Sequence, residues 1–239
     1  MANICDSLNP LKIEHLLGKP KNRIKRVGVE LEGAWENLPP GVVLEHDGSV
    51  FHNNRPMGYK VGELPLVRMQ PAQLRTAISK YYPHKIDETC GMHVHMSFEM
   101  IRHYSLLMVP EYPDTIIYFL HKWALDSDLP KRHPIWERLA GNSIFCQKKF
   151  WPEEQIRNAE KDHDKRRIGH RYTVINYCWR NGTIECRVLP MMSNAELAIS
   201  AIKMVLDITN ACLIVLGKYK EICVKNRVEV AEDYEEYFT

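Results

Sequence analysis

The segment Cys90–Phe98, with the sequence CGMHVHMSF, contains two histidines separated by a single residue. Side chains alternate between the two faces of a β-strand, so an extended segment places His93 and His95 on one face. The residues of the opposite face are apolar: Met92, Val94 and Met96. The pattern predicts a strand that packs into a core with one face and presents imidazoles on the other. A structural role, with the rings satisfied by hydrogen bonds, is the alternative reading of such histidines.

The same alternation recurs in three other segments, where it places acidic, amide and guanidinium groups on one face. These residues are Glu30 and Glu32 in the predicted strand 27–34, Glu185 and Arg187 in 183–188, and Asn176 in 172–177. Repeated acid and imidazole pairs are unusual for strands that simply face water. One shared polar face with this composition is suited to hard cations and phosphates.

Further elements follow from periodicity and turn residues. The predicted strands are 42–46, which ends at the turn Asp47-Gly48-Ser49, and 59–67, which contains Glu63 and is placed at an edge or bulge by Pro65. The predicted helices are 71–82, 114–125 with Asp114 as a cap, an exposed helix at 153–163, and a long helix that starts at the capping box Ser193–Glu196. The long helix is expected to pack across the apolar back of the sheet.

Composition places the chain among soluble globular proteins. It has 239 residues, of which 45% are hydrophobic and 26% charged, with a formal net charge of +2. This charge gives no general attraction to nucleic acid or membranes. The seven cysteines have no regular spacing, which favours buried free thiols and a reducing cytoplasm. We expect no signal peptide and no membrane span, because Lys203 and Asp207 interrupt the most apolar stretch, 197–216.

The sequence predicts a basic N-terminal lead-in (1–26), a single domain (27–225), which is a catalytic domain by the resemblance described below, and an acidic C-terminal tail (226–239). A basic loop at 164–171 follows the predicted exposed helix, and loops of this kind near a phosphate site often act as clamps. The sequence leaves the roles of the basic region 161–171 and of the tail open.

The motifs, taken in order, resemble the compact amidoligases, which are carboxylate-amine ligases of the glutamine synthetase and glutamate-cysteine ligase superfamily. The matching motifs are Gly28–Glu32, Asp47–Ser49, Glu63 with Pro65, Cys90–His95, Arg138, Asn176 and Gly182–Arg187. The resemblance covers roughly residues 26–215. One departure is the segment Leu64-Pro65-Leu66, where the family usually has Ser-Pro-Pro. The resemblance implies an α+β fold in which a curved antiparallel sheet cups the active site and helices pack on its back.

The resemblance also implies roles for individual residues. Glu30, His93 and Glu185 would hold a metal ion that bridges the β- and γ-phosphates of ATP, and Glu32 and Glu63 would hold a second ion nearer the substrate. His95, Arg138 and Arg187 would contact phosphates, Asn176 would orient substrate or a metal-bound water, and Asp47 would bind or deprotonate the amine. The implied cations are two or more Mg²⁺, with Mn²⁺ as a substitute.

The implied reaction joins a carboxylate to an amine at the expense of ATP. The carboxylate attacks the γ-phosphate to form an acyl phosphate, and the amine then displaces phosphate. The products are an amide or peptide-type bond, ADP and phosphate. The partners are a carboxylate-bearing substrate and an amine acceptor, either a small molecule or a peptide, and their identities and the oligomeric state are left open by the sequence.

Two alternatives belong to other classes of function. A His-x-His pair with carboxylates also suits a Zn²⁺ or Fe²⁺ hydrolase that activates water. Three or more glutamates against two histidines favour Mg²⁺ or Mn²⁺ instead. A protein that binds nucleic acid or an acidic partner through Lys161–Arg171 is the weaker alternative, because the net charge is near neutral.

Overall fold

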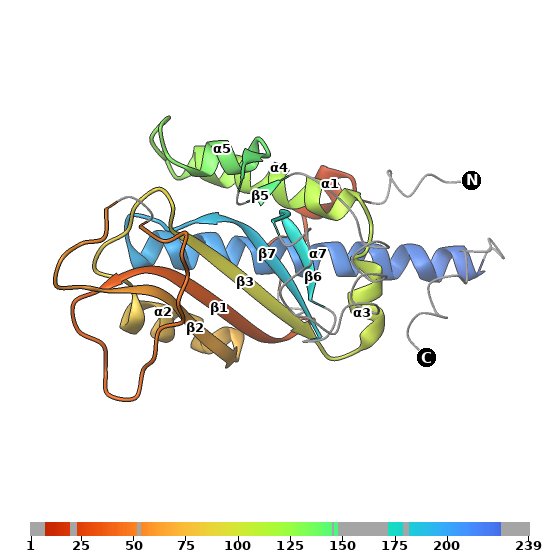
Figure 1. Cartoon of the computed structure of the whole chain (residues 1–239). Coiled ribbons are helices and arrows are strands. Elements are labelled where there is room, and N and C mark those ends of the chain that lie inside the picture. Colours follow the sequence, from red (N-terminus) through yellow and green to blue (C-terminus); the bar gives the residue numbers. More distant parts are fainter. Residues whose placement is uncertain are drawn as a thin grey trace, which may run out of the picture.

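The protein has an α+β fold, in which helices pack on one face of an antiparallel sheet (Figure 1). The computed structural model describes residues 8–19, 23–51, 54–144, 146–147, 172–178 and 182–225. The strands are β1 (Ile24–Trp35), β2 (Lys60–Met69), β3 (Gly91–Phe98), β4 (Asn142–Ser143), β5 (Cys146–Gln147), β6 (Ile175–Cys178) and β7 (Thr183–Pro190). The helices are α1 (Pro10–Glu14), η2 (Pro71–Gln73), α2 (Leu74–Tyr81), α3 (Ile101–Leu106), α4 (Glu111–Asp126), α5 (Ile135–Leu139) and α7 (Ala195–Lys225).

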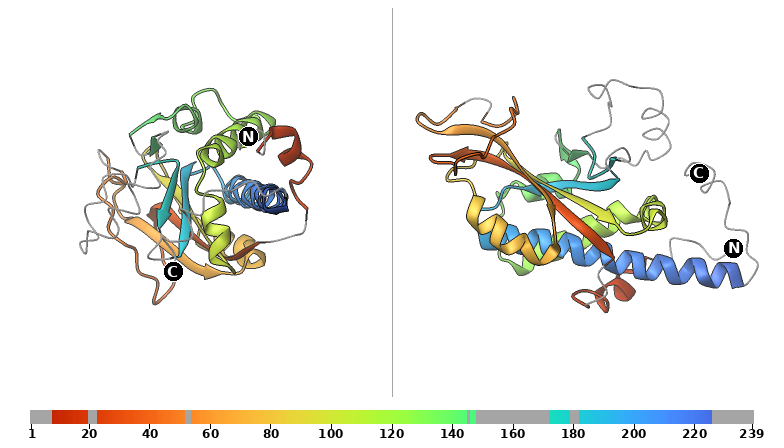
Figure 2. Two further views of the ribbon diagram at one scale, coloured as in Figure 1. Left: turned by 90° about the vertical axis from the view of Figure 1, so that its right-hand side faces the viewer. Right: turned by 90° about the horizontal axis from the view of Figure 1, so that it is seen from below.

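Five strands form the main sheet in the order β2-β1-β3-β7-β6, and all neighbouring pairs are antiparallel. Strands β4 and β5 form a separate short pair. Helix α7 runs behind the sheet, where it packs against α4 and α2 and contacts β3 (Figures 1 and 2). The predicted α+β class with an antiparallel sheet and helices on its back is therefore confirmed.

The alternation in β3 is borne out by burial. Met92, Val94 and Met96 have no exposed surface and join the hydrophobic core, as do Val29 and Leu31 from β1. The buried face of the sheet meets the apolar stripe of α7. Among the described residues no long helix covers the opposite face, which carries the polar residues (Figure 1).

Two expected helix starts are wrong by a few residues. Helix α4 begins at Glu111 after Pro110, so Asp114 lies in its first turn and is not the cap. At the start of α7 the side chain of Asn194, not Ser193, accepts the backbone N–H of Leu197 at 2.9 Å. Either Ser or Asn satisfies a helix N-terminus, so the sequence alone did not decide between adjacent capping residues.

The expected strand at 42–46 is also wrong. Only Glu45 pairs there, through an isolated bridge to Glu63 on the outer edge of β2. Gly62 allows this approach, because an added Cβ would lie 2.4 Å from the carbonyl oxygen of Glu45. The expected strand 172–177 is shortened to β6, and helix 71–82 is divided into η2 and α2. The predicted helix 153–163, the basic loop and the tail from 226 lie outside the described residues.

Helix α7 is long and apolar enough, in its part Ala195–Lys218, to cross a membrane by length and composition. The sequence expectation had treated Lys203 and Asp207 as interruptions of this stretch. In the fold, 61% of its most apolar window is buried, and a core helix meets the same criterion.

The end of β1 makes a close approach that only glycine permits. A Cβ on Gly33 would lie 2.5 Å from the Cβ of Pro83, in the segment that hydrogen-bonds to Ala34. We predict that Gly33→Ala lowers the free energy of unfolding by about 1–3 kcal/mol, as overpacking does. Gly217→Ala is the matched control, because nothing lies within 4 Å of its Cβ and alanine favours the interior of α7. Urea denaturation should show opposite shifts, and an unchanged midpoint for Gly33→Ala would contradict the close contact.

Candidate functional site

The polar face of the sheet is assembled by strand register. Polar residues lie beside one another on neighbouring strands, so all five strands of the main sheet contribute to a continuous row. The cross-strand pairs are Glu32 with Glu63, Glu30 with His93, His95 with Gly28 and Glu185, and Glu185 with Asn176. Residues far apart in the sequence thus converge without any loop having to close over them.

The imidazole of His93 lies at the centre of this row. Its Nδ1 lies 2.9 Å from Glu30 Oε2 and 3.7 Å from Glu185 Oε1. Its Nε2 lies 3.7 Å from Glu32 Oε1. The ring is 5% exposed, so three carboxylates approach a buried histidine from two sides.

Two groups of possible metal ligands share this histidine. One contains Glu30, His93 and Glu185, and the other contains Glu32, Glu63 and His93. In each group one ligand atom from every residue lies within 4.8 Å of the others. The structure therefore brings together all five residues that the sequence interpretation assigned to metal binding, with His93 added to the predicted pair of Glu32 and Glu63. Metal binding itself stays a prediction.

The carboxylates of the site differ in the charge that they carry. Burial would raise the pKa of Glu30, but hydrogen bonds to His93 and His95 outweigh it and lower the pKa far below its usual range. Glu63 has no hydrogen bond to a histidine among the described residues. Burial and the neighbouring carboxylates, Glu30 and Glu32 first, raise its pKa to about 8. Negative charge accumulates toward β2, where a cation would relieve the repulsion.

Glu185 links the metal-ligand group to an arginine. Burial would raise the pKa of its carboxyl, but Arg187 and the two histidines lower it. The guanidinium of Arg187 donates to Oε1 of Glu185, and the amide of Asn176 donates to Oε2 at 2.8 Å. Arg187 Nε is buried and has no hydrogen-bond partner within the part of the chain that the structure describes. A buried guanidinium N–H group without a hydrogen-bond partner is suited to binding an anionic ligand.

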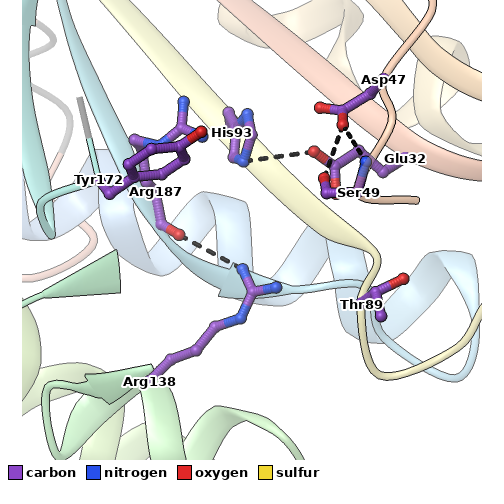
Figure 3. A pocket seen from close by; sticks show the side chains of 8 residues that line it. All are labelled: Glu32, Asp47, Ser49, Thr89, His93, Arg138, Tyr172 and Arg187. Carbon is purple, nitrogen blue, oxygen red and sulfur yellow. Dashed lines mark hydrogen bonds and ion pairs between the residues drawn. The ribbon is translucent and has the colours of Figure 1, made fainter. Parts of the chain in front are cut away.

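Arg138 reaches the same place from α5. It is 3% exposed and donates to the carbonyl oxygens of Leu189 at 3.0 Å and Cys90 at 3.4 Å. Arg138 is therefore not an exposed arginine at a helix end, which would have been its role as a purely structural surface residue. The guanidinium fastens α5 to β7 and to the start of β3. Its predicted contact with phosphate stays a prediction, and Arg138 does line the pocket (Figure 3).

The pocket lies where β3 begins. Its lining is polar, and Figure 3 shows the side chains converging from the sheet, from α5 and from the loop after Glu45: Glu32, Asp47, Ser49, Thr89, His93, Arg138, Tyr172 and Arg187. Asp47 accepts hydrogen bonds from the N–H and hydroxyl of Ser49 at 2.7 and 2.6 Å. Thr89 accepts the N–H of Phe51 at 3.0 Å, which ties the Asp47 loop to β3. Asp47 and Glu32 thus line the same pocket, and the predicted role of Asp47 toward the amine stays a prediction.

Some residues of the site were missed by the sequence interpretation. Gly91 donates its N–H to Glu32, and a Cβ there would lie 3.0 Å from Arg138 and 3.2 Å from His93. Cys178 is one of the seven cysteines that the sequence interpretation expected to be buried free thiols. It lies instead on the polar face, 3.5 Å from Glu185 Oε2. Its spacing of two from Asn176 was a usable signal, because alternate residues share a face.

No protein-family model, curated protein or solved structure matches this chain.

The raised pKa of Glu63 gives a pH dependence for the metal-free protein. Between pH 4.5, the ordinary value, and about 8, the folded state holds a proton that the unfolded state has lost. Its contribution to stability therefore falls as pH rises through this range. We predict that Glu63→Gln is more stable than the wild type in EDTA, with an advantage that grows from pH 5 to pH 8. The expected rise is roughly 2–4 °C in Tm for each kcal/mol of relieved repulsion.

Divalent cations supply the control for this prediction. Mg²⁺ should raise the Tm of the wild type at pH 8 and raise that of Glu63→Gln much less. Glu196→Gln serves as the matched variant, because Glu196 is exposed and pairs only with Arg75 at the surface. A constant difference between wild type and Glu63→Gln at all pH values would contradict the crowded carboxylates.

Proposed function

We propose that the protein is an ATP-dependent carboxylate-amine ligase with a glutamine synthetase-like fold, and that it works with Mg²⁺ or Mn²⁺. One observation carries the proposal: two groups of oxygen-rich ligands share His93, beside a buried arginine with an unpartnered donor. Phosphoryl transfer needs such a combination, because triphosphate charge must be neutralised while the transferred group is stabilised. The motif order adds support that does not depend on the geometry.

The donor set favours hard cations. The two shared groups contain four carboxylates and a single imidazole. Carboxylates suit Mg²⁺ and Mn²⁺, whereas zinc sites of hydrolases usually rely on several histidines or thiolates. Bound at these groups, the cations would neutralise phosphate oxygens and orient the nucleotide. Glu30, His93 and Glu185 would hold the ion at the β- and γ-phosphates, with Glu32 and Glu63 at the ion near the carboxylate substrate.

The remaining residues have roles that match their positions. Arg187 lines the pocket, and its buried Nε has no hydrogen-bond partner among the described residues. It would stabilise the transferring phosphoryl group, while His95 would contact phosphate. Arg138 would donate to phosphate through any N–H group of its guanidinium that does not bind a backbone carbonyl. Asn176 holds Glu185 at 2.8 Å and so fixes the orientation of this carboxylate. Asp47 would receive the amine, because its carboxylate lines the pocket next to Glu32.

The proposed reaction has two steps. An oxygen of the substrate carboxylate attacks the γ-phosphorus, the bond to the β-bridging oxygen breaks, and ADP leaves. The amine then attacks the acyl carbon, loses a proton to Asp47 or solvent, and displaces inorganic phosphate. The polar lining of the pocket suits small polar or peptide substrates, and the cytoplasm, where ATP and Mg²⁺ are present, is the proposed location.

To test the proposal, the protein is incubated with ATP, Mg²⁺, amines and candidate carboxylic acids that carry ¹⁸O in the carboxylate. Amino acids, polyamines and peptides are screened for stimulated release of phosphate. We predict ADP and phosphate as products, with ¹⁸O in the phosphate only when the amine is present for turnover. AMP carrying the label would contradict the acyl-phosphate route.

The Glu185→Gln variant tests the site. It keeps the size of the side chain but removes the charge, so turnover should fall by roughly 10³-fold, as for loss of a strong electrostatic contact in a preorganised site. Glu196→Gln is again the control and should be unaffected. Near-normal turnover of Glu185→Gln at saturating Mg²⁺ would remove Glu185 from the site, and folding of both variants is checked by circular dichroism.

A further inference from the structure

A third set of possible ligands lies at the end of the polar row nearest β6. It contains His95, Cys178 and Glu185, and one ligand atom from each lies within 4.8 Å of the others. Unlike the two sets that share His93, it includes a thiol. Thiolate and imidazole select zinc-class cations over Mg²⁺, which prefers oxygen. We propose that His95, Cys178 and Glu185 form a separate binding site for a transition-metal cation such as Zn²⁺.

The distances fit a tetrahedral ion. With a metal–sulfur bond of about 2.3 Å and metal–oxygen or metal–nitrogen bonds of about 2.0 Å, neighbouring ligand atoms lie roughly 3.3–3.6 Å apart. Cys178 Sγ lies 3.5 Å from Glu185 Oε2, which is within this range. Nε2 of His95 lies 3.0 Å from Glu30 Oε1, so binding of the ion requires His95 to exchange this hydrogen bond for the metal.

The two oxygens of Glu185 point to different neighbours. Oε1 faces His93 at 3.7 Å, on the side of the hard-cation groups. Oε2 faces Asn176 and Cys178. One carboxylate can therefore serve two adjacent ions, one through each oxygen, and Asn176 fixes this orientation.

The site also has access and an open position. Cys178 and His95 are half-buried, whereas Glu185 is 3% exposed. Three protein ligands on a partly open face leave room for a water molecule as the fourth ligand. Cys90, Cys146, Cys186 and Cys212 are buried and belong to no such ligand set among the described residues.

Cobalt(II) absorption tests the proposal on the full chain without any assay of ATP turnover, so its outcome is independent of the proposed ligase activity. Reduced, chelator-treated protein is titrated with Co²⁺ in excess Mg²⁺. We predict a sulfur-to-cobalt charge-transfer band that saturates at one equivalent and that Zn²⁺ removes. Cys178→Ser should abolish the band and weaken Zn²⁺ binding by roughly 10-fold or more, at least the effect of losing an outer-shell contact.

Cys212→Ala is the matched control, because this thiol is buried in α7 behind the sheet, and it should keep the band. Absence of the band from the wild type, or its persistence in Cys178→Ser, overturns the proposal. A second measurement uses the wild type alone, in case the variant does not fold. Zn²⁺, but not Mg²⁺, should slow alkylation of Cys178 measured by peptide mass spectrometry, and equal rates with and without Zn²⁺ would contradict the site.

Discussion

The antiparallel register of β1 and β3 places Glu30 opposite His93, and the rest of the polar face depends on this pairing. A slip of one residue would turn both histidines into the core and Met92, Val94 and Met96 outward. Burial of these apolar side chains against α7 therefore holds the register. The same packing that stabilises the fold keeps the ligand atoms within reach of one another.

This arrangement has an electrostatic cost that is unevenly distributed. Near β7 the carboxylates are balanced, since Glu185 has Arg187 and Glu30 has two imidazoles. Near β2 they are not, because Glu63 faces Glu32 and has no cationic side chain among its described hydrogen bonds or ion pairs. A protein does not gain stability by crowding like charges in a half-buried place. The imbalance is what a cation site would show before the cation binds.

Much of the site was predictable from sequence because strands expose alternate residues. That rule placed Glu30, Glu32, His93 and Glu185 on one face, and the structure agrees. Register cannot be read from alternation alone, so the pairing of Glu32 with Glu63 depended on family resemblance. The assignment of Arg138 to the site also depended on the family resemblance. A helix as short as α5 has too few residues for a periodic pattern that would indicate the direction of its arginine side chain. Cys178 was missed because a cysteine between apolar residues was assigned to the core. The cap at Asn194 was not predicted because the adjacent Ser193 is an equally good capping residue. The expected strand 42–46 was wrong because only Glu45 pairs there, through its bridge to Glu63.

The central claim is that the polar face binds two hard cations around His93 together with a nucleotide. Electron paramagnetic resonance of Mn²⁺, titrated into the protein with a non-hydrolysable ATP analogue, tests it most directly. The account predicts two Mn²⁺ ions for each chain, with signals broadened by spin coupling because both ligand groups share one imidazole. Binding of a single uncoupled Mn²⁺, or binding that the nucleotide analogue does not change, would contradict it.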